Sequence, residues 1–310
     1  MIEFNYVTKY YHSYRAINFL NYKFTSKRIA VYGEEGSGKS TFLRLLSGVE
    51  KVSEGEILID GKPAEINEDT YFTFRNGGLE NKSVRENIEY PLKIRKVEGY
   101  DKIATKVLEE NGLLEFQNVI LKKLPFEEKA RLILAKLTLR DTSLMLIDNP
   151  FKDLEKSVRE EYFKKFLSII KDYKGVVVYA TDNREEIKEF SEVLLLNFGF
   201  VKGVGKLDDI LVNPSNLFTY ELYNKLKLIN GNLLVNNGVL EFHEGDRVGI
   251  IKDEIQKRIP SVFLPGESIL AIPVKEIENK GFIVEDFTVR DIDKLDDYFL
   301  FDWNENSLLK

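Results

Sequence analysis

The chain has 310 residues, of which 31% are charged, with a net charge of −6 and a pI near 5.4. This length allows a large α/β domain and a smaller second one, and the acidic balance gives no electrostatic footprint for nucleic acid. There is no cysteine, which excludes disulfides and cysteine-ligated zinc and fits a reducing compartment.

No secretory signal is expected at the N-terminus, and the longest apolar runs, such as Val176–Ala180, are too short to span a bilayer. Contact with a membrane is therefore expected only through a partner.

The first 31 residues predict two antiparallel strands that lead into a third. Residues 2–31 alternate between apolar and polar side chains, and Arg28–Tyr32 ends this stretch as a buried strand. An apolar-faced helix is predicted to begin at Thr41–Leu46.

Between this strand and this helix lies a glycine-rich run, Gly33–Thr41 (GEEGSGKST), that fits the phosphate-loop pattern. Its backbone N–H groups and the start of the helix would face a nucleoside triphosphate, Lys39 would reach the outer phosphates and Ser40 would ligate Mg²⁺. The alternative is a glycine–serine turn that matches by chance. The expected nucleotide-binding residues of the run are Gly33, Gly36, Ser37, Gly38, Lys39, Ser40 and Thr41.

The middle of the chain predicts alternating strands and helices. Gly55–Gly61 reads as a strand that runs into a tight turn, and the apolar spacing of Ser83–Lys136 is helical. Leu144–Asp148 is a buried strand ending in a carboxylate, and two further strands follow at Gly175–Ala180 and Val193–Leu196. This rhythm predicts a parallel sheet with helices on its faces.

The sequence pattern changes at the turn Asn213–Pro214. Short β-rich runs separated by Gly, Pro, Asp and Asn predict a small β-barrel. His243 is expected in a turn between strands, solvated rather than functional. The expected strands are Leu233–Val235, Val248–Ile251, Ile269–Val274, Gly281–Val284 and Tyr298–Phe301.

From about Phe4 to Asp209 the chain resembles the ATP-binding cassette (ABC) ATPases, which implies a P-loop nucleotide-binding domain with a helical subdomain. Leu146–Asp148 looks like the second phosphate-site motif, in which Asp148 would hold the Mg²⁺ shell. Ser83–Ile88 resembles the start of the helical subdomain. Tyr11 matches the aromatic that stacks on adenine, although it could equally be one of many core or surface tyrosines.

Three positions that serve hydrolysis in this family are altered. The glutamate that polarises the attacking water is replaced by Asn149, and the switch histidine by Asp182. The loop glutamine corresponds to Arg75, with one residue of slack. Losing a general base typically costs ~10²–10⁴-fold in rate. The resemblance therefore implies weak or absent hydrolysis.

A fourth change affects the signature loop, which in dimers of this family contacts the partner's ATP. The usual Leu-Ser-Gly-Gly-Gln is matched here by Leu124 followed by Pro125, Phe126, Glu127 and Glu128. Two carboxylates would oppose a sandwiched ATP. The alternative is a drifted helix cap that faces solvent, and on both views the signature function is lost.

The resemblance divides the chain into a nucleotide-binding domain at 1–212, with a helical subdomain at about 76–136, and a β-rich domain at 213–310 that faintly resembles the accessory domain of carbohydrate importers. It implies a cytoplasmic Mg-ATP-binding subunit on the inner face of a membrane, with permease subunits and a second cassette as partners. Two rivals stay open: an active ATPase completed by a different cassette, and a nucleotide-gated regulatory or scaffold protein without a permease.

Overall fold

The computed structural model describes residues 1–12, 14–73, 79–139, 141–212, 218–219, 222, 226–236, 239–244, 247–251, 266–273, 288–289, 298–299 and 301–302. The chain forms two compact units, Met1–Leu207 and Asp208–Lys310. Among the described residues, no helix is both long and apolar enough to cross a bilayer. The boundary expected at 212/213 stays a prediction.

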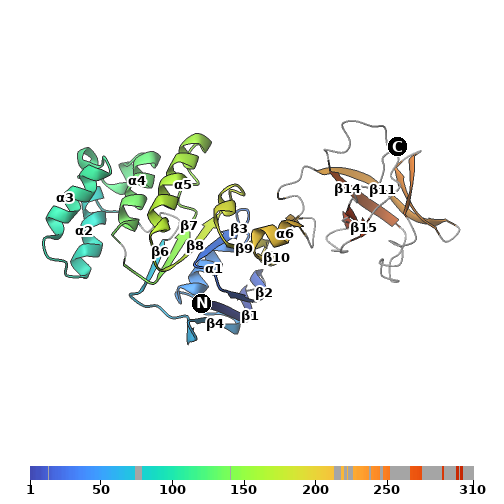
Figure 1. The fold of residues 1–310 in the computed structure, drawn as a ribbon, viewed down its shortest axis with the longest axis horizontal. Coiled ribbons are helices and arrows are strands. Elements are labelled where there is room, and N and C mark those ends of the chain that lie inside the picture. The colour runs from blue at the N-terminus through green and yellow to red at the C-terminus, as the bar shows by residue number, and fades with distance from the viewer. Residues whose placement is uncertain are drawn as a thin grey trace. The chain divides into compact units, whose positions relative to one another are not determined.

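A ten-stranded sheet forms the centre of the first unit, in the order β5-β4-β1-β2-β10-β9-β3-β8-β7-β6 (Figure 1). One part, β6, β7, β8, β3 and β9, is parallel, whereas β1, β2, β4 and β5 pair antiparallel. The strands are β1 (Ile2–Tyr11), β2 (Tyr14–Phe24), β3 (Arg28–Tyr32), β4 (Glu54–Ile59), β5 (Lys62–Pro63), β6 (Thr70–Thr73), β7 (Leu144–Asp148), β8 (Val176–Thr181), β9 (Glu192–Asn197) and β10 (Phe200–Gly205).

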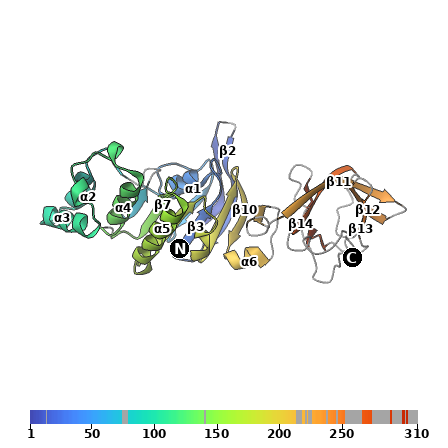
Figure 2. The same cartoon turned by 90° about the horizontal axis from the view of Figure 1, so that it is seen from above.

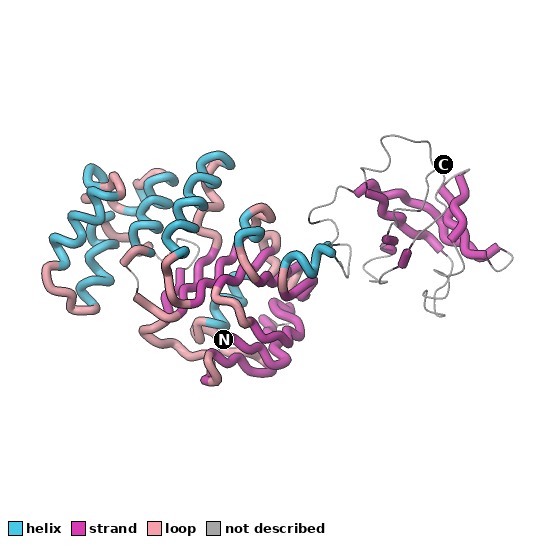
Figure 3. Tube along the Cα trace, in the orientation of Figure 1, coloured by secondary structure: helices cyan, strands magenta, loops and turns pink. Residues whose placement is uncertain are grey.

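The helices of this unit gather mainly at the β6 end of the sheet, as the tube in Figure 3 and the view from above in Figure 2 show. Helix α2 begins with a capping box between Ser83 and Glu86, which satisfies free N–H groups of its first turn. The helices are α1 (Lys39–Leu46), α2 (Val84–Ile94), α3 (Tyr100–Glu110), η1 (Leu114–Phe116), η2 (Leu121–Lys123), α4 (Phe126–Leu137), α5 (Lys156–Lys171), η3 (Glu186–Glu189) and α6 (Leu207–Val212).

The core explains why the antiparallel and parallel strands form one body. Helix α1 packs the Phe42 ring between aromatics of β1 and β2, with ring centroids 4.9 Å from Phe4 and 6.4 Å from Phe24. All five residues of β7 are buried, as expected for a strand covered on both faces. The loop that starts α1 is thereby fixed against strands on both sides of it.

The second unit contains a five-stranded sheet, in the order β13-β12-β11-β14-β16, and a two-stranded one. The predicted small β-barrel stays a prediction, and the strand expected at Gly281–Val284 lies outside the described residues. The strands are β11 (Leu226–Asn236), β12 (Val239–Glu244), β13 (Arg247–Ile251), β14 (Gly266–Pro273), β15 (Thr288–Val289), β16 (Tyr298–Phe299) and β17 (Phe301–Asp302).

The expectation that His243 lies in a turn is wrong. His243 lies in β12, opposite Asn232 of β11 and Val248 of β13. Residues 240–243 alternate between apolar and polar types, which is the pattern of a strand, and β12 continues to Glu244.

Candidate functional site

The glycine-rich loop lies where β3 ends and α1 begins. Two of its glycines are required by close backbone contacts. A Cβ on Gly38 would lie 2.3 Å from the Ala16 carbonyl oxygen, and Gly38 has a φ of 109°. A Cβ on Gly33 would lie 2.4 Å from the Leu196 carbonyl oxygen. The loop therefore fits between β2 and β9 only with glycine at these positions.

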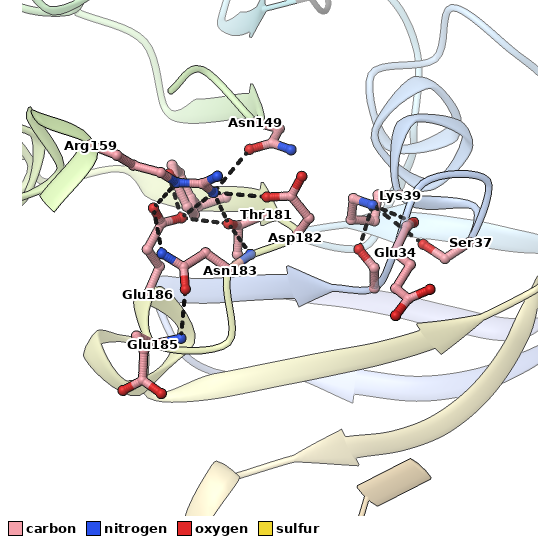
Figure 4. Close-up of polar contacts among 12 residues, drawn as sticks. Glu34, Ser37, Lys39, Asn149, Arg159, Thr181, Asp182, Asn183, Glu185 and Glu186 are labelled. Carbon is pink, nitrogen blue, oxygen red and sulfur yellow. Dashed lines mark hydrogen bonds and ion pairs between the residues drawn. The ribbon is translucent and has the colours of Figure 1, made fainter. Parts of the chain in front are cut away.

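The Lys39 ammonium is held inside the curve of this loop (Figure 4). Its Nζ donates to the carbonyl oxygens of Gly33 at 2.6 Å and Glu34 at 2.8 Å, and also contacts the Ser37 hydroxyl at 3.4 Å. Only 8% of the Lys39 surface is exposed. A fixed, largely buried cation at the start of a helix is an anion-binding arrangement.

A pocket of about 380 Å³ opens over the loop. This volume is in the range of small-molecule sites, which is about 300–1,000 Å³. The pocket lies at the carboxyl ends of β3, β7 and β8, where open α/β sheets bind ligands. Its lining comprises Tyr11, Tyr14, Ala16, Glu35, Gly36, Ser37, Gly38, Lys39, Ser40, Thr41, Arg44, Asp148, Asn149, Lys152 and Asp182.

Two oxygen ligands in this pocket suit a magnesium ion. Ser40 is the second residue of α1, and Asp148 ends β7 with only 4% of its surface exposed. The backbone N–H of Asp148 donates to the Thr73 hydroxyl at 3.0 Å, which fixes the strand end. The described residues hold no group of three or more His, Cys, Asp or Glu side chains arranged for a metal. Mg²⁺ commonly binds through one or two protein ligands plus phosphates, and the residues present fit that mode.

Tyr11 borders the pocket next to Tyr14, and its hydroxyl is anchored. The hydroxyl donates to the Glu50 carboxylate, and the Lys9 ammonium lies 5.1 Å from the ring centroid. Burial raises the pKa of the Tyr11 phenol, and the hydrogen bond to Glu50 raises it further. The ring is thus held at the pocket edge, and its stacking on a base stays a prediction.

Beside the phosphate loop, Arg159 of α5 joins several side chains (Figure 4). Its Nε donates to Glu186 Oε1 at 2.6 Å, and its Nη2 donates to Asp182 Oδ1 at 2.9 Å. The same Nη2 lies 3.2 Å from Asn149 Oδ1 and 3.0 Å from the Thr181 hydroxyl. Burial lowers the pKa of the Arg159 guanidinium, but Glu186 outweighs this and the pKa is raised, so the group stays charged.

The side chains of Asn149 and Asp182 therefore line the pocket and are also held in place by hydrogen bonds to neighbouring residues. Asn149 follows β7 with a φ of 40°, and its N–H donates to the Ala180 carbonyl at 2.9 Å. Burial raises the pKa of Asp182, but the hydrogen bond from Asn149 and the charge of Arg159 hold it below its usual value. Asp182 is accordingly an anion at neutral pH.

The signature-loop residues lie at the start of α4. Pro125 precedes the helix, and Phe126 is 58% exposed and borders a separate cavity of about 370 Å³. Glu127 is engaged within the unit, since Oε1 accepts from Arg131 at 3.1 Å and from the Tyr162 hydroxyl at 3.1 Å. Glu128 is exposed. The pocket over the phosphate loop is lined by none of these four residues.

The structure thus places most of the expected nucleotide-site residues around one pocket. Gly33 does not line the pocket, but its carbonyl oxygen accepts a hydrogen bond from Lys39, which does. Arg75 lies outside the described residues. Sequence reasoning missed Arg159 and Glu186, because the partners of Arg159 are 10 to 27 residues away and no local pattern marks either residue.

Comparisons with known proteins agree with this geometry. Residues 20–152 match a family model described as ABC transporter. A sulfate/thiosulfate import ATP-binding protein, CysA of Mesostigma viride, is 26% identical over 89% of this chain and 82% of its own length. An oligosaccharides import ATP-binding protein, MsmX of Bacillus subtilis, is 24% identical over 88% of this chain and 77% of its own.

The fold is similar to that of a solved, dimeric bacterial ABC transporter cassette, MJ0796. The TM-score is 0.58 at 23% identity, over 66% of this chain and 98% of that one. The expected α/β P-loop architecture is thereby confirmed for the first unit.

Proposed function

We propose that this chain, of which residues 20–152 match the ABC transporter family model, is the Mg-ATP-binding subunit of an importer and hydrolyses ATP weakly or not at all. The observation that carries the proposal is the pocket in which Lys39, Ser40 and Asp148 converge. The loop N–H groups and Lys39 would take the phosphates, and Ser40 and Asp148 would hold Mg²⁺. When bound, Mg²⁺ would offset phosphate charge.

Weak hydrolysis follows from the groups on the outer-phosphate side of the pocket. An amide at Asn149 cannot take a proton from water, and its oxygen already accepts a hydrogen bond from Arg159. Asp182, at the switch position, accepts hydrogen bonds where a donor would be needed. With Asn149 and Asp182 at these positions, the pocket keeps the groups that would bind Mg-ATP. It lacks the general base and the hydrogen-bond donor that would act in the transition state.

Partners and location are proposed from the relatives. Two relatives that cover most of this chain are import ATP-binding proteins, which supports a permease partner and a position on the cytoplasmic face of a membrane. Their names give sulfate/thiosulfate and oligosaccharides, so carbohydrate import is one proposal for the solute. Co-purification from native membranes tests this: a polytopic permease is expected, and a soluble client alone would favour a regulatory role.

The altered residues also keep an alternative in view, namely an ATPase completed by a different cassette. Such a partner would have to supply its own signature loop opposite Lys39. Co-purification would then recover a second cassette with the permease.

The direct test of nucleotide binding is Lys39→Ala, measured by isothermal titration with Mg-ATP. We expect binding to be lost, because the only cation inside the curve of the described loop is removed. Lys27→Ala is the matched control, since Lys27 is exposed and bonds the Lys174 carbonyl outside the pocket. Equal affinity in wild type and Lys39→Ala would refute the phosphate-loop assignment.

A further inference from the structure

The position of Asp182 in the pocket bears on which nucleotide binds most tightly. It lines the pocket over the phosphate loop, and its charge interacts with that of Lys39. In Figure 4 the Asp182 carboxylate lies between the Arg159 group and Lys39. Because a phosphate-loop lysine contacts the outer phosphates, Asp182 faces the end of the pocket that a third phosphate would enter.

The charge of Asp182 is only partly compensated. Arg159 is one cation shared by two carboxylates, with its Nε 2.6 Å from Glu186 Oε1 and its Nη2 2.9 Å from Asp182 Oδ1. Glu186 is 3% exposed and receives the shorter contact. The three side chains together therefore carry one net negative charge, and Asp182 is the member that borders the pocket.

Other charges at the pocket do not cancel the net negative charge of the Arg159, Glu186 and Asp182 group. Arg44 lies on the Tyr11 side of the pocket, 3.3 Å from Glu50, a carboxylate that it shares with Lys9 at 3.7 Å. Lys152 is exposed, where water screens its charge. Mg²⁺ at Ser40 and Asp148 would accompany a diphosphate and a triphosphate alike. The backbone N–H groups of the loop cradle the inner phosphates, which both nucleotides have.

We propose that this site prefers nucleoside diphosphates to triphosphates and that Asp182 is the residue that determines the preference. The proposal rests on the proposed function, because it presupposes that a nucleotide binds at Lys39. A triphosphate brings additional negative charge within Coulomb range of a fixed carboxylate in a partly buried site. The preference is for phosphate number and does not depend on the base.

The test is isothermal titration of the full chain with Mg-ADP and Mg-ATP. We expect ADP to bind about tenfold more tightly than ATP, a discrimination of the size that one partly screened charge produces. In Asp182→Asn, which keeps an oxygen acceptor for Arg159, ATP is expected to gain most of that factor while ADP is unchanged. Glu185→Gln is the control, since this exposed carboxylate is paired with Lys188 and does not line the pocket.

Each outcome of these titrations either supports or overturns the proposal. ATP binding as tightly as ADP in wild type overturns the inference without any variant, and it would point to Lys152 as a compensating cation. Equal changes in both affinities in Asp182→Asn also overturn it. If neither nucleotide binds, the proposed function itself fails, which is a different result from binding without discrimination.

Discussion

Under the proposed function, Asn149 stands where a hydrolytic site of the ABC family has its glutamate. It follows β7 directly after Asp148, so its position is set by the same strand end that would hold the metal. Its side chain, however, is fixed by Arg159, with Nη2 3.2 Å from Oδ1. A side chain at this position is therefore within reach of the Arg159 guanidinium.

Asn149→Glu is expected to leave phosphate release within about tenfold of the wild-type rate, because groups that act as a unit do not contribute additively. A glutamate here would meet Arg159, which would hold the new carboxylate as an ion pair instead of leaving it free for water. Malachite-green detection of phosphate measures the rate, with Lys39→Ala giving the background. A gain of several hundredfold would identify Asn149 as the main defect.

At the residue scale, sequence reasoning located the groups that follow strand ends. Lys39, Ser40 and Asp148 were predictable because the phosphate loop and the acidic strand end have fixed local patterns, and the structure brings them to one pocket. Their ligand roles stay predictions. Arg159 was not predictable, because its contacts join the interior of a helix to loops after two different strands.

At the scale of elements, the Arg159–Glu186 pair connects α5 to the segment after β8. Both side chains are largely buried, and Glu186 also accepts hydrogen bonds from the Tyr179 and Thr181 hydroxyls. Tyr179 stacks on Phe166 of α5, with ring centroids 5.0 Å apart. The helix and the strand are therefore joined by an ion pair set beside an aromatic contact.

Arg159→Met is expected to lower the free energy of unfolding by about 3–5 kcal/mol, because it leaves Glu186 buried without its cation. The double variant Arg159→Met/Glu186→Gln should recover part of this loss, since the buried charge of Glu186 is removed together with that of Arg159. Urea unfolding of the wild type, Arg159→Met, Glu186→Gln and the double variant, followed by circular dichroism, gives the coupling free energy.

The control for that cycle is Arg131→Met on α4. Arg131 pairs with Glu127 at 3.1 Å, but Glu127 is half exposed, so a loss of about 1 kcal/mol or less is expected. A loss in Arg159→Met no larger than in Arg131→Met would show that the Arg159 cluster does not stabilise the fold.

Buried strands were the elements that the sequence predicted best. β3, β7, β8 and β9 appear as continuous apolar runs because helices or neighbouring strands cover both of their faces. β6 and β10 were missed: β6 has four residues, and β10 carries two glycines and is mostly half-buried. Their strand conformation depends on pairing with β7 and β9 rather than on local pattern.

At the scale of the whole chain, the two compact units suggest that nucleotide binding belongs to the first. All residues that line the pocket precede residue 183. A chain ending after Val212 is therefore expected to bind Mg-ATP within about twofold of the full chain, as independent domains do. Titration of both chains measures this, with circular dichroism as the check on folding. Lost binding in a folded truncation would contradict the division at 212/213.

The last prediction concerns pairing with a second copy. In the head-to-tail dimers of the ABC family, one composite site combines the phosphate loop of one chain with the signature loop of the other, so a homodimer of this chain would have two defective sites. Asn149 and Asp182 alter the half around Lys39. Phe126 and Glu127 alter the half offered to a partner, and Glu127 is already bonded to Arg131 and Tyr162. A carboxylate near the partner's phosphates would oppose closure.

We therefore expect the isolated protein to stay monomeric with Mg-ATP, or to pair without closing over it, and to release phosphate at the background rate. Light scattering with and without Mg-ATP, run beside a phosphate-release assay, measures both properties, and Lys39→Ala sets the nucleotide-free baseline. An ATP-induced dimer with turnover far above that baseline would mean that other groups, among them Lys152 at the pocket and Arg75, replace the missing ones.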